Sequence, residues 1–215
     1  MFNTIFPRIH KEGYQFLVIG IIASFLGLLL SKTLGLILVV VTIWIYYFFR
    51  DPDRFSINDD NYLVSPADGL ISNISEVNGP IEIGLENKKF TKVSVFMNVF
   101  NCHVNRSPIS GQVEEIFYKP GKFLNASLDK ASEENERNYF KINLKNGEEI
   151  IIVQIAGLIA RRIVCEVEQG QELKQGERIG MIRFGSRVDI YFKNKKVLAK
   201  LGQNVVAGES LIASE

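Results

Sequence analysis

Apolar residues are distributed unevenly along the chain, and the first fifty residues differ from all that follow. Residues 16–49 are almost all apolar, and Lys32 is the single charged residue among them. The run divides at Ser31-Lys32-Thr33 into arms of 15 and 16 residues, each about 24 Å long as a helix. One continuous helix would bury Lys32 near mid-bilayer, at a cost of about 3 kcal/mol. The pattern therefore predicts a membrane-associated helical hairpin over residues 1–50, with Lys32 at its turn.

Basic residues lie outside both ends of this hairpin, Arg8 and Lys11 before it and Arg50 and Arg54 after it. This distribution favours both ends on the cytoplasmic face of a cell membrane. A secretory signal peptide is an alternative, but the run has no small-residue cleavage site and continues into bulky residues 46–49. A hairpin buried in a soluble domain is another, and the remaining 165 residues would have to cover it. Both alternatives stay open at this point.

Beyond the polar linker Asp51-Pro52-Asp53-Arg54, the apolar residues occur in short runs. Residues 92–100, 149–155 and 188–192 are rich in β-branched and aromatic side chains, and Gly, Asn and Pro separate such runs. Short runs with this punctuation are typical of strands. We therefore predict a mainly β domain over residues 51–215.

Two pairs of segments in this domain repeat each other. Residues 65–74 match residues 107–116 in the pattern Ser-Pro, two residues, Gly, then an alternating strand. Residues 170–179 match residues 202–211 in the pattern Gly-Gln, an apolar residue, then Gly-Glu and another apolar residue. The second pair resembles the hairpins of lipoyl- and biotinyl-like barrel-sandwich domains, which is the fold that we predict. A carrier domain of that kind needs a lysine at a tight hairpin tip, and no lysine stands in such a turn.

Composition narrows the classes of function. The 25 Lys and Arg residues nearly balance 24 Asp and Glu residues, so the field of a nucleic-acid-binding protein is missing and we expect no nucleic-acid partner. Two cysteines, Cys102 and Cys165, make no disulfide framework and favour a reducing compartment. His103 is the single histidine of the predicted β domain, which leaves no obvious ligand set for a metal.

Two places carry candidate chemistry. His103 follows an apolar strand in a polar stretch, where it is either a packed side chain or a proton-transfer group. Gly185-Ser186 lies between two predicted strands, and a Gly-Ser pair in such a connection is ordinarily only a turn. The surrounding motifs change this interpretation.

Several blocks of the sequence, taken in order, resemble the short prokaryotic form of the phosphatidylserine decarboxylase family. They are Phe48-Phe49-Arg50-Asp51-Pro52, Ser65-Pro66-Ala67-Asp68-Gly69, His103-Val104-Asn105-Arg106-Ser107-Pro108, residues 125–137, residues 154–162 and Phe184-Gly185-Ser186-Arg187. Together the blocks extend over nearly the whole chain.

The resemblance implies a self-processing enzyme that converts phosphatidylserine to phosphatidylethanolamine and carbon dioxide. The chain would break between Gly185 and Ser186 into pieces 1–185 and 186–215, which stay together as a heterodimer. Ser186 would become a pyruvoyl cofactor, whose carbonyl takes up the electrons that decarboxylation leaves behind. His103 would serve as general base or proton donor. Asp68 matches the acidic residue that orients a histidine in the family, although an Asp-Gly turn is its structural alternative.

One departure from longer family members affects these roles. They carry a second histidine three places after the first, where this chain has Arg106, so one imidazole would have to serve both steps. Arg106, Arg161 and Arg162 are candidates for binding the lipid phosphate or the departing carboxylate, with surface ion pairs as the alternative. The implied partners are a phospholipid and a membrane, and homo-oligomers remain open. The competing function is a membrane-anchored lipoyl-like adaptor, which needs no reactive centre and keeps an intact chain.

Overall fold

The computed structural model describes residues 6–124, 134–157, 162–183 and 186–215. The chain divides into two compact units, residues 1–53 and residues 54–215. Gly185, Arg161 and most of the block 125–137 lie outside the described residues.

The first unit is a helical hairpin. A 3₁₀ turn, η1 (Lys11–Gly13), leads into α2 (Tyr14–Leu30), and α3 (Lys32–Phe48) returns beside it. The short strands β1 (Arg8–Ile9) and β2 (Arg50–Asp51) pair antiparallel at its open end. The break between the helices is the single extended residue Ser31, at φ −160°. The predicted hairpin is therefore confirmed, and its turn is tighter than the three-residue break read from the sequence because Lys32 already begins α3.

Small and hydroxylated residues let the two helices approach closely. Ser24 Oγ lies 3.0 Å from Thr42 Oγ1 on the other helix, and each hydroxyl also donates to a carbonyl of its own helix. The outward faces carry large apolar side chains, with Leu30 and Val40 80% and 66% exposed. Of the described helices, the segment Lys11–Leu30 is long and apolar enough to cross a membrane, whereas α3 is shorter. The hairpin thus presents an apolar surface that is typical of membrane contact.

The second unit consists of strands, as the sequence predicted. Its elements are β3 (Tyr62–Val64), β4 (Gly69–Asn78), η2 (Ile81–Ile83), β5 (Lys89–Met97), β6 (Val104–Arg106), β7 (Gly111–Lys119), β8 (Arg137–Asn143), β9 (Glu149–Ile155), β10 (Arg162–Cys165), β11 (Glu172–Leu173), β12 (Arg178–Arg183), β13 (Ser186–Phe192), β14 (Lys196–Val197), β15 (Asn204–Val205) and β16 (Leu211–Ser214).

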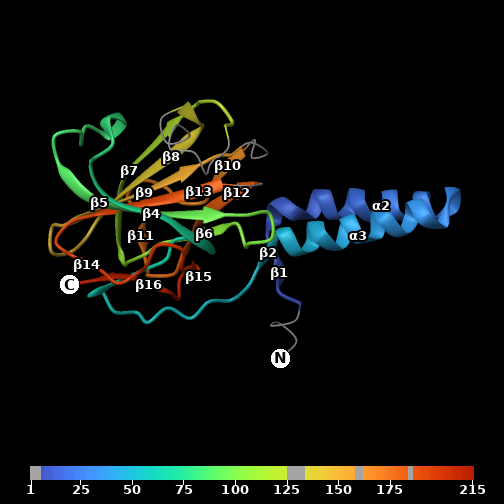
Figure 1. Ribbon diagram of the computed structural model, residues 1–215, viewed down its shortest axis with the longest axis horizontal. Coiled ribbons are helices and arrows are strands. Elements are labelled where there is room, and N and C mark those ends of the chain that lie inside the picture. The colour runs from blue at the N-terminus through green and yellow to red at the C-terminus, as the bar shows by residue number, and fades with distance from the viewer. Residues whose placement is uncertain (1–5, 125–133, 158–161, 184–185) are drawn as a thin grey trace. The chain divides into compact units, whose positions relative to one another are not determined.

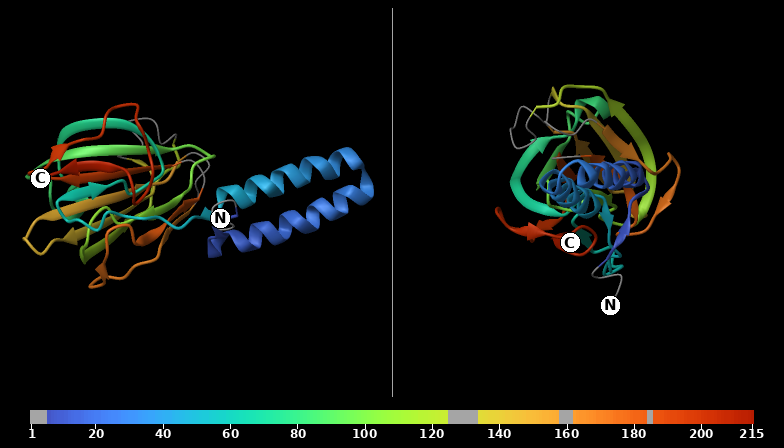
Figure 2. Two further views of the ribbon diagram at one scale, coloured as in Figure 1. Left: turned by 90° about the horizontal axis from the view of Figure 1, so that it is seen from below. Right: turned by 90° about the vertical axis from the view of Figure 1, so that its right-hand side faces the viewer.

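Eight of these strands form one curled sheet in the order β11-β7-β8-β9-β13-β5-β4-β15 (Figure 1). Two three-stranded sheets, β10-β12-β6 and β14-β16-β3, complete the unit, and Figure 2 shows the strands gathered around one interior. The mainly β prediction with an N-terminal helical hairpin is confirmed. β9 has the predicted bounds, whereas β13 begins two residues earlier than its apolar run indicated, because Ser186 already pairs with β5.

Side chains alternate between two faces of the curled sheet, as a strand requires. On β13, Val188, Ile190 and Phe192 join the main hydrophobic core. Tyr191 packs instead with a smaller cluster around Phe90 on the other face. We call these the core face and the outer face. Ser186 belongs to the core face by the same alternation, which matches its complete burial.

Candidate active site

Ser186 is the first residue of β13, an interior strand of the curled sheet, and it lies at the edge of the sheet that is formed by strand ends. It pairs with Met97, the last residue of β5. Its side chain is fully buried, and Oγ lies 4.0 Å from Met97 Sδ. A serine hydroxyl is thus held inside the domain, directly after the two residues 184 and 185 that the structure leaves undescribed. A thioether accepts hydrogen bonds only weakly, so this contact does not commit the hydroxyl strongly.

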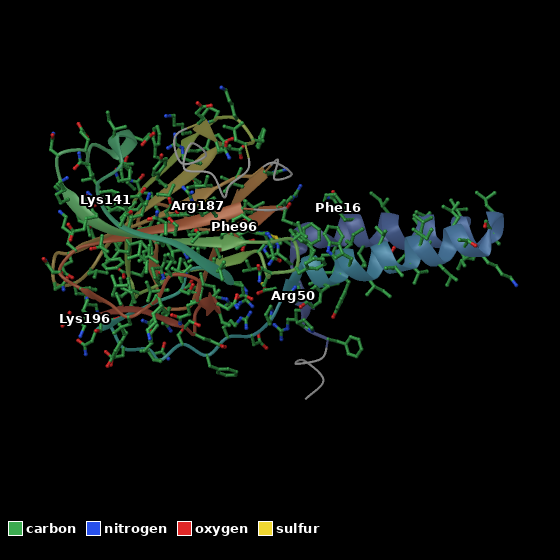
Figure 3. The ribbon with its side chains drawn as sticks, in the orientation of Figure 1. Phe16, Arg50, Phe96, Lys141, Arg187 and Lys196 are labelled. Atoms are coloured by element: carbon green, nitrogen blue, oxygen red, sulfur yellow. The ribbon has the colours of Figure 1, made fainter. Side chains whose placement is uncertain are left out.

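The strand register brings several chain segments to this edge. Arg187 pairs with Phe96 on β5 and with Ile155 on β9, and Figure 3 shows Arg187 and Phe96 on their neighbouring strands. Phe96 also pairs with Leu70 on β4. Arg187, Phe96 and Leu70 therefore lie side by side on three adjacent strands. The next residues toward the strand ends are Ser186, Met97 and Gly69, so the Ser-Pro-Ala-Asp-Gly block and Ser186 meet at one edge.

His103 is the residue before β6, and its backbone lies next to β12. Its carbonyl accepts a hydrogen bond from the Ile182 amide at 3.3 Å, and the following residue, Val104, pairs with Met181 on β12. β12 ends at Arg183, one residue before the undescribed pair that precedes Ser186. The imidazole is fully buried, and its Nδ1 lies 3.0 Å from the Asn101 carbonyl oxygen. The structure therefore places His103 beside the strand that leads into the predicted cleavage site.

The carboxylate of Asp68 has hydrogen-bond partners that the sequence did not indicate. It accepts two hydrogen bonds from Arg54 Nη2, at 3.1 and 2.8 Å, and one from the Ala207 amide at 2.8 Å. In the described part of the chain these are its partners, and His103 is not among them. The role of orienting the histidine stays a prediction, while the contacts seen are structural.

The three candidate arginines have different surroundings. Arg106 is buried and its Nη1 donates to the Gly176 carbonyl at 2.8 Å, so part of its guanidinium is used within the fold. Arg162 is exposed at the start of β10 and pairs in register with Arg183 at the end of β12. Burial lowers the pKa of Arg183 from its ordinary value. Arg161 lies outside the described residues. Of the three, Arg162 is the one seen exposed, and it flanks the strand that leads toward Ser186.

A chain of buried amides on the core face was missed by the sequence analysis. Asn138 Nδ2 donates to Gln154 Oε1 at 3.3 Å, and Gln154 Nε2 donates to Asn105 Oδ1 at 2.8 Å. Asn105 Nδ2 in turn lies 3.6 Å from Met97 Sδ, the sulfur that Ser186 contacts. The signal was present in the sequence as polar residues inside apolar strands, and two of them, Asn105 and Gln154, belong to the family-like blocks.

The outer face behind Ser186 carries charged side chains. Arg187 Nε lies 2.9 Å from Asp189 Oδ1, and both residues are buried. A cavity of about 470 Å³ on this face is lined by Arg137, Tyr139 and Glu82, among others. Burial acts to raise the pKa of Glu82, but the hydrogen bond from Lys119 and the charge of Arg137 outweigh it, so the pKa lies below its ordinary value. Burial raises the pKa of Tyr139 above its ordinary value.

The described residues contain neither a disulfide nor a cluster of metal-ligating side chains. Cys102 is buried and Cys165 exposed, and neither forms a disulfide. Within residues 6–124, 134–157, 162–183 and 186–215, no three His, Cys, Asp or Glu side chains are grouped to hold a metal ion.

Comparison with known proteins gives the family. A sequence profile described as phosphatidylserine decarboxylase matches residues 41–213. A phosphatidylserine decarboxylase proenzyme of Pelagibacter ubique (strain HTCC1062) is 65% identical over 215 residues, which is 100% of both chains. A protein of the same name from Cereibacter sphaeroides (strain ATCC 17025 / ATH 2.4.3) is 50% identical over 214 residues, covering 99% of this chain and 92% of the relative. Like a third such proenzyme, from Rickettsia typhi (strain ATCC VR-144 / Wilmington) at 49% identity over 213 residues, these relatives match nearly end to end. The chain belongs to the phosphatidylserine decarboxylase family, and it is an enzyme of that class.

Proposed function

We propose that this chain is a proenzyme that cleaves itself between Gly185 and Ser186 and then decarboxylates phosphatidylserine at the membrane. The observation that carries the proposal is the buried Ser186 hydroxyl at the start of β13, in contact with Met97 at the end of β5. His103 lies next to β12, the strand that precedes the proposed cleavage site, because its carbonyl accepts from the Ile182 amide. The relatives named proenzymes support a processing step. The products of processing would be a large subunit, 1–185, and a small subunit, 186–215, which share the curled sheet.

Cleavage uses groups of the chain itself. Ser186 Oγ adds to the carbonyl carbon of Gly185 and its proton passes to His103. The C–N bond then breaks and the Ser186 nitrogen takes a proton, which leaves an ester. Removal of the Ser186 α-proton expels the Gly185 carboxylate, and water converts the remaining dehydroalanine to a pyruvoyl group and ammonia. His103 suits the proton transfers because an imidazole has a reference pKa of about 6.5.

The residues around Ser186 fit a small ketone at this position. The side chain occupies a buried site beside the Met97 sulfur, and the buried Asn105 amide contacts the same sulfur. When formed, the pyruvoyl carbonyl supplies the electron sink that loss of carbon dioxide from an amino acid requires. His103 would hold the proton that replaces the carboxylate, and Arg162, exposed at the start of β10, would bind the lipid phosphate or the carboxylate.

The hairpin supports the substrate assignment. Its outward apolar side chains suit contact with acyl chains, and flanking Arg8, Lys11 and Arg50 favour the cytoplasmic leaflet. An enzyme that takes its substrate from a membrane gains from such an anchor, because the lipid and the catalytic domain are then kept at one surface. Cell-membrane localisation with a cytoplasmic catalytic domain is thus part of the proposal.

Intact-mass measurement of the purified full-length chain tests the cleavage. The wild type should yield two pieces, the smaller of 30 residues with a blocked N-terminus. Ser186→Ala should remain one inactive chain, and Ser110→Ala, which removes another serine hydroxyl of the same unit, should cleave normally. A folded wild type that stays intact would favour the adaptor function instead.

His103→Asn tests the proton-transfer role. The amide has a similar size but cannot exchange a proton, so cleavage should fail or, where it survives, turnover of phosphatidylserine should fall by about 10²–10⁴-fold. Normal cleavage and turnover in this variant, with an unchanged melting temperature, would leave His103 as a packed side chain.

The membrane anchor is tested by extraction of membranes from cells that express the full chain. Ile19→Lys and Val40→Lys place a charge on the exposed faces of the two helices and should weaken membrane retention. Leu201→Lys introduces the same charge at an exposed leucine of the β unit and should not. Equal retention of all three variants would contradict the assignment of the hairpin as the anchor.

A further inference from the structure

The amide chain Asn138–Gln154–Asn105 is buried throughout and ends at Met97 Sδ, the sulfur that Ser186 Oγ also contacts. The three side chains come from β8, β9 and β6, and at most 2% of any of them is exposed. Burying primary amides in a strand-rich core is costly unless their donors and acceptors are satisfied. The hydrogen bonds among these three amides therefore show which N–H and C=O groups have a partner of their own kind and which do not.

The hydrogen bonds determine which way the last amide points. Because Gln154 Oε1 accepts from Asn138 at 3.3 Å, its Nε2 is the group that faces Asn105. A donor there requires an acceptor, so Asn105 presents Oδ1 to Gln154 and turns Nδ2 the other way. Nδ2 consequently faces Met97 Sδ, 3.6 Å away. Gln154 and Asn138 thus fix the orientation of the Asn105 amide.

Among the residues that the structure describes, the Nδ2 group of Asn105 has no strong acceptor. In the described residues its hydrogen-bond partner is the Met97 thioether, and a thioether is a weak acceptor. The same sulfur lies 4.0 Å from Ser186 Oγ, so a buried amide donor and the reactive hydroxyl contact one sulfur atom. An amide held in this way is preorganised to donate to an oxygen that becomes negative during reaction.

We propose that Asn105 is a further catalytic residue, which donates from Nδ2 to the oxyanion formed at the Gly185 carbonyl during self-cleavage. This inference rests on the proposed function. As Ser186 Oγ bonds to the Gly185 carbonyl carbon, the C=O electron pair moves to the oxygen, and the Asn105 N–H stabilises the charge there. The pair returns when the C–N bond breaks and the Ser186 nitrogen takes the proton held by His103. Gln154 and Asn138 are positioning residues that act through Asn105.

The test is the rate at which newly made full-length chain is cleaved, followed by intact mass during cell-free synthesis. Asn105→Leu removes the donor at similar volume and should slow cleavage about 10²–10³-fold, the usual effect of losing one such donor. Gln154→Leu should slow it less, about tenfold, because Asn105 keeps its N–H but loses its orientation. The double variant should be no slower than Asn105→Leu alone, whereas independent packing defects would multiply.

A matched control separates catalysis from packing. Gln175 is another buried glutamine, and its Nε2 donates to the carbonyls of Tyr62 and Pro108 at 2.8 and 3.3 Å. Gln175→Leu should lower the melting temperature and leave the cleavage rate of the folded chain unchanged. Cleavage slowed equally by Gln175→Leu and Asn105→Leu would overturn the proposal.

Asn105→Asp provides a second readout if the leucine variant does not fold. An ionised carboxylate cannot donate and repels an oxyanion, whereas its protonated form can donate. Cleavage of this variant should therefore recover as the pH falls, opposite to the loss expected when His103 becomes protonated in the wild type. A wild-type rate and pH profile in Asn105→Asp would overturn the inference while wild-type cleavage still upheld the proposed function. An uncleaved wild type would instead remove the proposed function itself.

Discussion

The β unit contains two copies of one turn-and-hairpin arrangement. The first repeat is residues 65–74 with 202–211, and the second repeat is residues 107–116 with 170–179. In each, the serine hydroxyl donates to the carbonyl two residues on, from Ser65 to Ala67 and from Ser107 to Ile109, both at 2.7 Å. Gly208 and Gly176 then donate to the carbonyls of these two serines, both at 2.8 Å.

The two repeats also bind each other reciprocally. The Arg106 amide donates to the Pro66 carbonyl, and the Val64 amide donates to the Pro108 carbonyl, each at 2.9 Å. The residue before one Ser-Pro turn thus caps the other turn, as a local two-fold arrangement requires. The repeated sequence blocks are therefore repeated in structure.

Among the positions at which the two turns differ is the one before the shared glycine, where Asp68 in the first repeat matches Ser110 in the second. Both side chains accept from the amide that precedes the hairpin glycine: Asp68 from Ala207 at 2.8 Å, and Ser110 from Gln175 at 3.3 Å. Asp68 alone adds an ion pair, with Arg54 at 2.8 Å. The two repeats thus share their turn hydrogen bonds, and at this matched position a charge is present only in the repeat whose Gly69 lies at the edge with Ser186.

The largest expected effect follows from removing this difference. Asp68→Ala leaves Arg54 without its carboxylate and the Ala207 amide without its acceptor, and should lower the free energy of unfolding by about 2–4 kcal/mol. Ser110→Ala loses one long neutral hydrogen bond and should cost about 0.5–1.5 kcal/mol. Urea denaturation in the uncleavable Ser186→Ala background measures both. Equal losses would mean that the Asp68 ion pair does not stabilise the first repeat.

A smaller effect is expected at the hairpin glycines, which adopt φ of +80° at Gly176 and +76° at Gly208. An alanine in this region costs about 1–2 kcal/mol in either repeat. At Gly176 its Cβ would also come within 2.0 Å of Ser56 Oγ, whereas at Gly208 the nearest atom, Arg106 Cδ, is 3.2 Å away. Ser56 Oγ donates to the Gly208 carbonyl, so moving it loses that bond.

Gly176→Ala should therefore destabilise by about 1 kcal/mol more than Gly208→Ala, the net value of one hydrogen bond. Thermal unfolding of the two variants in the Ser186→Ala background makes the comparison. Adding Ser56→Gly should remove most of the gap, and a gap that persists would place the strain elsewhere.

The smallest effect is expected at the paired serines. Ser65→Ala and Ser107→Ala each remove a buried turn hydrogen bond of 2.7 Å, and Ser65→Ala also removes the long 3.4 Å bond that Ser65 Oγ accepts from the Ala67 amide. Each substitution should cost about 1 kcal/mol. Because the two donated bonds have the same length and the extra bond at Ser65 is long, the two losses should agree within about 0.5 kcal/mol. Denaturation midpoints check this agreement, and a much larger loss at one serine would show that the repeats are not energetically equivalent.

Much of this organisation could be predicted from the sequence, because it depends on local patterns. The charge-poor run around Lys32 determines the hairpin, since apolar helices must avoid a buried cation. β-branched runs between turn residues determine the strands. The duplicated Ser-Pro and Gly-Gln blocks indicated repeated turns, and the motif around His103 and Ser186 indicated the family.

Tertiary structure decided which of these side chains meet. Ser186 faces Met97 only because β13 pairs with β5 in one register, and a shift of one residue would turn it to the outer face. The sequence offered Asp68 as a partner for histidine, whereas the fold gives it Arg54 and the Ala207 amide. Asn105, Gln154 and Asn138 are far apart in sequence and share no local pattern. Their hydrogen-bonded chain exists because three separate strands place polar residues on the same face of one core, a condition set by strand pairing and invisible to local periodicity.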